Sequence, residues 1–302
     1  MGDICACVLL SGGFVSSFFL WKEERAFASL CMASLAKASR LDPQCGDRDN
    51  FRVFRRRTLS FVGSVTVAVF LLEYMLRHGI AGNSSVGNGA APRRLLPVKG
   101  EVFEFLRDAV VSTVATLALF AGPLMERGTS VLALQRERFV IARDLIICPL
   151  GEEVFFRGLI LQLLLHQRSF TVAMAISSLL FALSHTHHIF SIAVEAYLEN
   201  EAEEPKATLQ RTCWKQAAAV IVSVYIRSIA CGLLTAYHYA AVGSRNVLAA
   251  FLTHATCNLV GALPLDFVRK RSFIRRLVGV ATYAGGIIGW FCITTYAKRW
   301  HA

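Results

Sequence analysis

Two adjacent carboxylates and a guanidinium occur in the middle of a long apolar run, which extends from Phe139 to Leu165. They belong to Glu152, Glu153 and Arg157. A charged side chain at the centre of a membrane helix costs about 2.5–3.5 kcal/mol on insertion scales, so charges there are usually paired and functional. These three residues are therefore the first candidates for chemistry, and other polar side chains must be sought that meet them.

Helical spacing predicts how these side chains point. Glu153 and Arg157 are four residues apart, so they share a helix face and we expect an ion pair. Glu152 is turned by about 100° from its neighbour at 3.6 residues per turn, which lets it project into a cavity. His254 and Asn258 also share a face by the same spacing, in a second apolar segment.

A third segment adds an aromatic ring and more imidazoles. Phe181 and His185 again have the spacing of four residues, which aims both rings the same way. We expect Phe181 to be a packing residue and His188 to be interfacial, with lining of the cavity mouth as its alternative role. The buried histidine expected at His238 is interpreted as structural.

One carboxylate, two histidines and an amide within a membrane are suited to hydrolysis. A buried carboxylate can take a proton from water, a histidine can position the water or protonate the leaving amine, and an amide can stabilise an oxyanion. The same side chains could bind zinc, since Glu152, His185 and His254 with a water match a catalytic zinc site. The sequence requires no cofactor, and it does not separate metal-free from zinc-assisted hydrolysis.

The composition places these residues in a membrane protein. The 302 residues are 55% hydrophobic and 18% charged, with a mean hydropathy of +0.49, whereas soluble domains are about 45–50% apolar and 25% charged. We predict an all-α polytopic bundle of about eight transmembrane helices that encloses a polar cavity. The expected spans are residues 4–21, 59–76, 103–123, 139–165, 169–184, 216–242, 246–263 and 278–297. Residues 38–58, 79–101 and 199–206 are expected to be loops.

Charge and cysteine content exclude other classes. The net charge of +11 comes from basic clusters next to apolar segments, as the positive-inside rule predicts for cytosolic loops, and no nucleic-acid motif accompanies it. Nine cysteines without a CxxC pair argue against a disulfide framework and a cysteine zinc site. The expected partners are thus membrane lipid and a membrane-borne substrate, not nucleic acid.

Three short motifs in order resemble the type II CAAX prenyl endopeptidases, the Ras-converting enzymes within a clan of membrane glutamate proteases. The first motif, E-E-x-x-x-R, runs from Glu152 to Arg157, and the second, F-x-x-x-H, runs from Phe181 to His185. The third, H-x-x-x-N, is formed by His254 and Asn258. The resemblance covers about residue 40 to the C-terminus.

The resemblance implies an enzyme that removes the last three residues of prenylated CaaX proteins. It implies that Glu152 activates water, that His185 and His254 orient water and substrate, and that Asn258 supports the oxyanion. Glu153 and Arg157 would be supporting residues. We expect one protease domain over residues 1–302, with a catalytic core at 139–263 and an N-terminal helix and basic loop at 1–58. It would reside in the endoplasmic reticulum membrane and be accessible from the cytosol.

Two alternatives remain open on the sequence. The first is a protease of the same clan that cleaves another peptide. The second is a non-catalytic scaffold or an ion transporter that uses the polar cavity, although no inverted repeat is evident.

Overall fold

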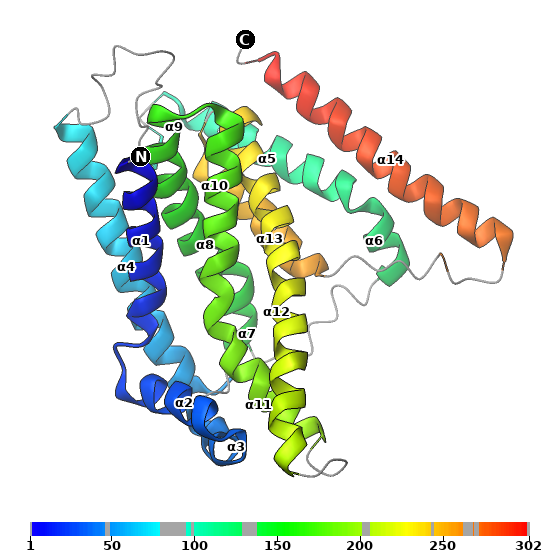
Figure 1. Ribbon diagram of the computed structural model, residues 1–302. Coiled ribbons are helices and arrows are strands. Elements are labelled where there is room, and N and C mark those ends of the chain that lie inside the picture. The colour runs from blue at the N-terminus through cyan, green and yellow to red at the C-terminus, as the bar shows by residue number, and fades with distance from the viewer. Residues whose placement is uncertain are drawn as a thin grey trace. The chain divides into compact units, whose positions relative to one another are not determined.

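The computed structural model describes most of the chain, and all its regular elements there are helical. It describes residues 2–45, 49–78, 95–97, 100–128, 138–200, 206–242, 245–261, 268 and 272–300. Helices account for the regular structure of these ranges (Figure 1), which confirms the all-α class. The predicted loop at 79–101 and the acidic loop at 199–206 lie almost entirely outside the described residues.

The chain divides into two compact units, each built from two stretches of sequence. The first unit contains residues 1–71 and 167–232, and the second contains 72–166 and 233–302. The elements of the first unit are α1 (Gly2–Phe18), α2 (Lys22–Ala33), α3 (Leu35–Cys45), most of α4 (Phe51–Arg77), α10 (Phe170–Leu183), the 3₁₀ turn η4 (Ser184–His188), α11 (Ile189–Asn200) and most of α12 (Lys206–Tyr237).

The core of the first unit follows from apolar residues spaced about four apart. Buried side chains at such spacings lie on one face of a helix. They form one cluster between α2–α3, α11 and α12, made by Phe27, Cys31, Leu35, Ala38, Ala193, Val194, Ala196, Tyr197, Leu209, Cys213 and Ala217. Far from this cluster, Arg168 donates to the carboxylate of Asp3 over 2.7 Å and ties the start of α1 to the start of α10. The carboxylate raises the pKa of Arg168.

The prediction of a loop at residues 38–58 is wrong. Helix α3 continues to Cys45, and α4 begins at Phe51, so the basic cluster lies in the first turns of a helix. Arginine is a good helix former. Two of these arginines also contact a buried glutamate of α2, described below.

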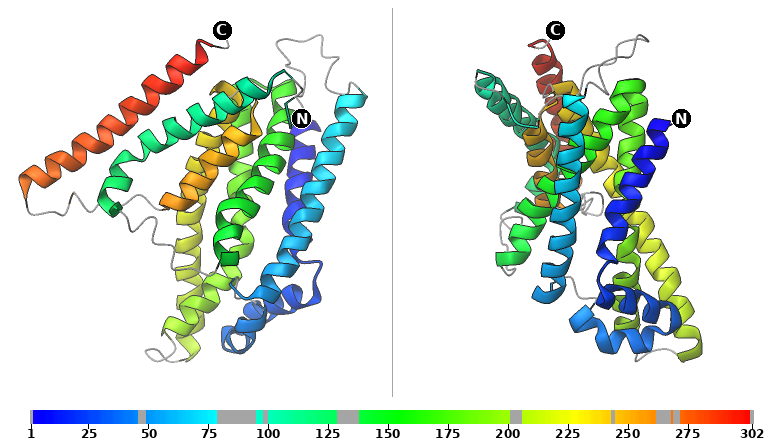
Figure 2. Two further views of the ribbon diagram at one scale, coloured as in Figure 1. Left: turned by 180° about the vertical axis from the view of Figure 1, so that it is seen from behind. Right: turned by 90° about the vertical axis from the view of Figure 1, so that its left-hand side faces the viewer.

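The second unit contains the acidic motif and its partners. Its elements are α5 (Val102–Leu119), α6 (Ala121–Arg127), α7 (Arg138–Ala142), the π-helical turn η2 (Arg143–Ile147), α8 (Cys148–Glu153), the π-helical segment η3 (Val154–Leu161), α9 (Gln162–Gln167), the π-helical turn η5 (His238–Val242), α13 (Val247–Val260) and α14 (Phe273–Lys298). Helices α5 and α14 lie side by side (Figures 1 and 2). Their close approach depends on Gly286, where a Cβ would come within 2.6 Å of the carbonyl oxygen of Ala118.

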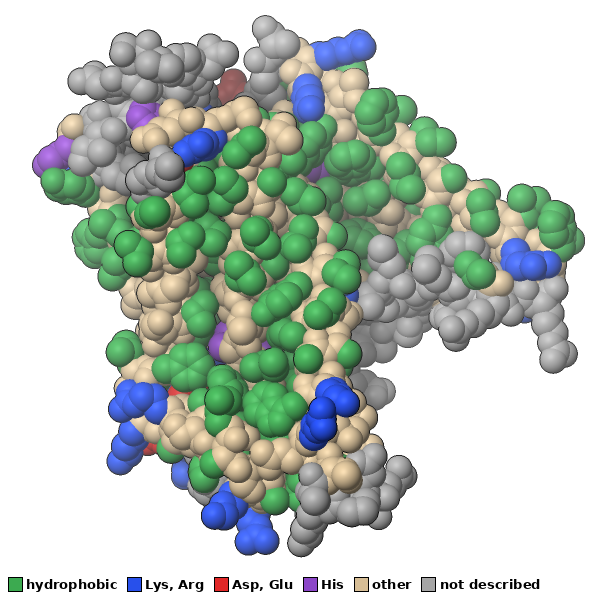
Figure 3. Space-filling model, viewed as in Figure 1, with side chains coloured by type: hydrophobic (Ala, Val, Ile, Leu, Met, Phe, Trp, Pro, Cys, Tyr) green, Lys and Arg blue, Asp and Glu red, His purple; other side chains and the backbone are tan. Residues whose placement is uncertain are grey.

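Within the described ranges, four helices are long and apolar enough to cross a membrane. They are Phe51–Tyr74, Phe170–Asn200, Thr208–Val242 and Phe273–Lys298. A fifth span results if α1 and α2, which are bent by 93° between them, are counted as one. Apolar side chains also remain exposed along these helices (Figure 3), as expected for surfaces that face lipid. The chain is thus a multi-pass membrane protein, and the eight spans and the enclosed cavity stay predictions.

Four of the eight predicted spans are not among these helices: 4–21 is shortened to α1, 103–123 is divided between α5 and α6, and two more are short helices. The predicted spans at 139–165 and 246–263 appear as shorter helices, and the first of them is interrupted by π-helical turns. The predicted span at 169–184 continues through η4 and α11, so it forms one longer candidate span with the following amphipathic segment.

Candidate active site

The first motif lies in a helical stretch whose geometry changes repeatedly. A π-helical turn, η2, precedes Cys148, α8 begins there, and η3 follows directly after Glu153. Pro149 occupies the first turn of α8, where its missing N–H is tolerated, and a wide turn before it accommodates the ring. Wide turns of this kind are frequent at functional sites. The motif therefore sits where the helix departs from α geometry on both sides.

Glu153 bridges a guanidinium and an imidazole in the interior of the second unit. Its Oε2 atom lies 3.1 Å from Nε of Arg157, and both side chains are fully buried. Its Oε1 atom lies 2.8 Å from Nδ1 of His254. The predicted pair with Arg157 is confirmed. The contact with His254 was missed, because spacing within one helix carries no information about a residue 101 positions away.

Glu152 occupies the other side of the same imidazole. Its Oε2 atom is 3.7 Å from Nε2 of His254, and 18% of its side chain is exposed. His254 therefore has one ring nitrogen toward each glutamate of the motif. Glu152 is the accessible carboxylate of the two, which agrees with the rotation expected between neighbouring helical residues.

Asn258, one helical turn after His254, already uses part of its hydrogen-bonding capacity. Its amide nitrogen donates to the backbone oxygen of Asp144 in η2 over 2.9 Å. The side chain is exposed. An amide nitrogen carries two hydrogens, so the bond to Asp144 orients the group and leaves one hydrogen for another acceptor.

A buried hydrogen-bond chain holds α13 against its neighbours, one residue before His254. Trp290 donates its indole N–H to Nε2 of His238 over 3.0 Å, and Nδ1 of His238 lies 2.8 Å from the hydroxyl of Thr253. An indole nitrogen is only a donor, so Nε2 of His238 must accept and Nδ1 must carry the hydrogen. The expectation that His238 is structural is confirmed, and it fixes the rotation of α13 from α14.

The second motif lies in the first unit, at the end of α10. His185 is placed by a bond of 2.9 Å from its Nδ1 to the backbone oxygen of Phe181, and the two rings meet edge to face at 5.0 Å. A carbonyl only accepts, so Nδ1 carries the hydrogen and Nε2 presents its lone pair. The ring of His188 lies 5.9 Å from that of His185. Spacing predicted this shared orientation.

The structure thus brings the predicted residues together in two sets. The second unit joins Glu152, Glu153, Arg157 and His254, with Asn258 on the next turn of α13, and the first unit joins Phe181, His185 and His188. The convergence of the two sets on one cavity stays a prediction. Among the described residues, no group of three or more His, Cys, Asp or Glu side chains is placed to hold a metal ion.

Comparison with known proteins adds the family. Residues 135–260 match the family described as type II CAAX prenyl endopeptidase Rce1-like. No curated protein and no solved structure matches the chain. All three motifs and the whole of α8, η3, α10 and α13 lie inside the matched range. Residues 135–260 of this chain are therefore a type II CAAX prenyl endopeptidase Rce1-like domain.

Proposed function

We propose that this protein is an intramembrane endopeptidase that removes the aaX tripeptide from the C-terminus of prenylated CaaX proteins. One observation carries the proposal. The accessible carboxylate of Glu152 and the buried carboxylate of Glu153 flank the imidazole of His254, inside the segment that matches the family. A carboxylate beside an oriented imidazole is suited to activating water.

The reaction needs one base, one oxyanion donor and one proton return. Glu152 takes a proton from water, and the water oxygen bonds to the carbonyl carbon of the prenylated cysteine. Asn258 donates to the oxyanion with the hydrogen not used by Asp144, and His254 orients water and substrate. When the C–N bond breaks, the proton taken by Glu152 passes to the leaving amine, and the tripeptide departs.

His185 has a separate task in this proposal. Its Nε2 lone pair is set by the bond from Nδ1 to Phe181, so it can accept a hydrogen from the attacking water and hold it in place. Glu153 and Arg157 do not touch substrate. They position His254, since Glu153 fills its Nδ1 site and Arg157 balances the buried charge.

A zinc-assisted variant of the reaction uses the same residues. Glu152, His185 and His254 would then be the ligands, and the metal would supply an activated water. The bond from Nδ1 of His254 to Glu153 leaves Nε2 for either role, as the neighbour of Glu152 in the metal-free reaction or as a zinc ligand. Treatment of the purified protein with a tight zinc chelator is expected to leave the rate of cleavage unchanged. Loss of activity that zinc restores would establish the metal variant.

The setting of the reaction follows from the substrate. A prenylated tail lies in the bilayer, so it enters from lipid between helices. We propose that the site opens to the cytosol and that the protein resides in the endoplasmic reticulum membrane, because CaaX tails are made in the cytosol. The basic first turns of α4, with Arg52 and Arg55 exposed, support a cytosolic position for that end of the helix.

The proposal is tested by cleavage of a farnesylated CaaX peptide by purified protein in detergent. Glu152→Ala, His185→Ala and His254→Ala are expected to reduce cleavage by at least about a hundredfold. Glu73→Ala, which removes an exposed glutamate of α4, is the control and is expected to cleave normally. Full activity of Glu152→Ala would refute the mechanism. Equal cleavage of the peptide without its prenyl group would refute the substrate class.

A further inference from the structure

The sharp bend between α1 and α2 is held rigidly by side chains of the first unit. Arg25 donates to the backbone oxygens of Phe19 and Leu20 over 2.8 and 2.7 Å, and so satisfies carbonyls beyond the end of α1. Trp21 donates to the hydroxyl of Ser60 on α4, over 2.9 Å. The backbone and the start of α4 are therefore fixed relative to each other at this point.

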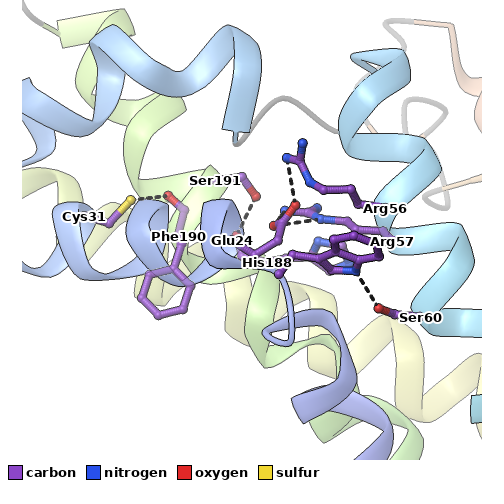
Figure 4. Close-up of polar contacts among 9 residues, drawn as sticks. Glu24, Cys31, Arg56, Arg57, Ser60, His188, Phe190 and Ser191 are labelled. Atoms are coloured by element: carbon purple, nitrogen blue, oxygen red, sulfur yellow. Dashed lines mark hydrogen bonds and ion pairs between the residues drawn. The ribbon is translucent and has the colours of Figure 1, made fainter.

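A buried carboxylate next to the bend receives two guanidinium groups. The side chain of Glu24 is 4% exposed, and its Oε2 atom accepts from Nε and Nη2 of Arg57 over 3.2 and 2.9 Å. Its Oε1 atom accepts from Nη2 of Arg56 over 3.3 Å (Figure 4). One negative and two positive charges leave this group with a surplus positive charge, which favours an anion nearby.

A small pocket adjoins only one of the two arginines. It is lined by the rings of Phe18, Phe27 and Phe190 and by Arg57, Glu24 and His187, while Arg56 is not part of the lining. The ring of His187 stacks on Phe18 at 4.9 Å. The Nη1 atom of Arg57 is not used in binding Glu24. The pocket thus combines aromatic walls with the Arg57–Glu24 ion pair and its surplus positive charge from Arg56.

We propose that this pocket binds the C-terminal carboxylate of the CaaX substrate, with Arg57 as its ligand. The inference rests on the proposed function, because only a protease that cleaves close to a free C-terminus needs such a site. Guanidinium is the side-chain group best matched to a carboxylate. The phenylalanine rings would flank the carboxylate and exclude water from the charged contact.

The pocket lies within the reach of a three-residue tail from His185. In the η4 turn, the ring centroid of His188 lies 5.9 Å from that of His185 and 4.0 Å from that of His187, which lines the pocket. An extended residue spans about 3.3–3.6 Å, so a three-residue tail reaches about 10 Å. A water held by His185 can therefore attack one end of the tripeptide while its carboxylate lies beside His187 and Arg57.

The test compares two farnesylated peptides that differ only in ending in a carboxylate or a carboxamide. Wild-type protein is expected to have a kcat/KM about tenfold or more higher for the carboxylate, since charge-assisted bonds are about twice as strong as neutral ones. Arg57→Gln is expected to cleave both peptides at the slower rate. Arg56→Gln removes a bond to the same Glu24 without altering the lining, so it is the matched control and is expected to keep the preference.

A second variant avoids the ion pair. Ala28 also lines the pocket, and Ala28→Phe fills it while Glu24, Arg56 and Arg57 stay in place. This variant is expected to lose the preference for the carboxylate and to unfold at the wild-type temperature. The result holds even if Arg57→Gln does not fold.

Two results would overturn the inference. Equal kcat/KM of the wild-type protein for both peptides excludes a carboxylate site and leaves the proposed function intact. An unchanged preference in both Arg57→Gln and Ala28→Phe places the site elsewhere. If neither peptide is cleaved, the proposed function fails, and equilibrium binding of the same two peptides to the same variants decides whether the pocket selects a carboxylate.

Discussion

Changing Glu153 to glutamine tests whether a buried carboxylate both stabilises the protein and orients His254. The carboxylate has one oxygen 3.1 Å from Nε of Arg157 and the other 2.8 Å from Nδ1 of His254. A carboxamide offers only one oxygen, so it can accept from one of the two partners and must turn its NH₂ group toward the other. Either Arg157 or His254 then faces a donor in the interior.

The structure contains a matched pair that sets the expected magnitude. Glu73 and Arg77 on α4 have the same spacing and the same Nε–Oε distance of 3.1 Å, but their side chains are 45% and 72% exposed. Breaking a buried pair by removing one partner costs about 3–5 kcal/mol, whereas an exposed helical pair contributes about 0.3–0.5 kcal/mol. Glu153→Gln is therefore expected to lower the free energy of unfolding by several kcal/mol, and Glu73→Gln by less than about 1 kcal/mol.

The catalytic effect is separated from the stability effect by a double variant. Replacing both partners of a buried pair by apolar residues of similar volume is often neutral, so Glu153→Leu with Arg157→Met is expected to recover stability. Its cleavage of a farnesylated CaaX peptide should remain about 10²- to 10⁴-fold below wild type, because His254 still lacks its partner at Nδ1.

Thermal unfolding in detergent measures the contribution of Glu153 to stability, and initial rates of cleavage measure its effect on activity. If Glu153→Gln unfolds at the wild-type temperature, the buried pair is not an energetic element of the fold. If the double variant cleaves at the wild-type rate, Glu153 does not act through His254. The second result refutes the assignment of Glu153 as the residue that positions the imidazole, and the first refutes only its contribution to stability.

Two further predictions concern helix packing in the second unit. Gly286→Ala is expected to lower the unfolding temperature by overpacking worth about 1–3 kcal/mol, since the new methyl group meets the carbonyl oxygen of Ala118. Gly285→Ala, whose new Cβ meets nothing within 4 Å, should stabilise the protein slightly, because the unfolded chain becomes less flexible. Shifts of the same sign in both variants would contradict the packing of α5 on α14. Trp290→Phe is expected to cost about 1–3 kcal/mol in the free energy of unfolding, because it leaves Nε2 of the fully buried His238 without its donor; an unfolding curve identical to wild type would show that this bond contributes nothing.

Local spacing was sufficient for contacts within one helix. It predicted the pair of Glu153 with Arg157 and the common direction of Phe181 and His185, because residues four apart in a helix face the same way. The all-α class was predicted from hydropathy, which is also a property of the local sequence. These predictions needed no knowledge of how one helix lies against another.

Contacts between helices could not be read in the same way. The approach of His254 to Glu153 depends on the rotation of α13, which is fixed by Thr253, His238 and Trp290 from other elements. The bend between α1 and α2 shows the same limit. Composition placed Arg57 in a basic loop. Its bond to the buried Glu24 depends on a bend of 93° between α1 and α2, which the periodicity of the sequence does not predict.

The two glutamates of the first motif differ in burial, and this difference assigns their roles. Glu153 is fully buried and has one oxygen toward each of two partners, so a substrate does not reach it. Glu152 keeps 18% of its side chain accessible and lies 3.7 Å from the opposite nitrogen of the same imidazole. In the proposed mechanism, Glu152 therefore takes a proton from water beside an imidazole whose other nitrogen is already bonded to Glu153. Arg157 contacts the other oxygen of Glu153. It stabilises the buried carboxylate and thereby the orientation of His254.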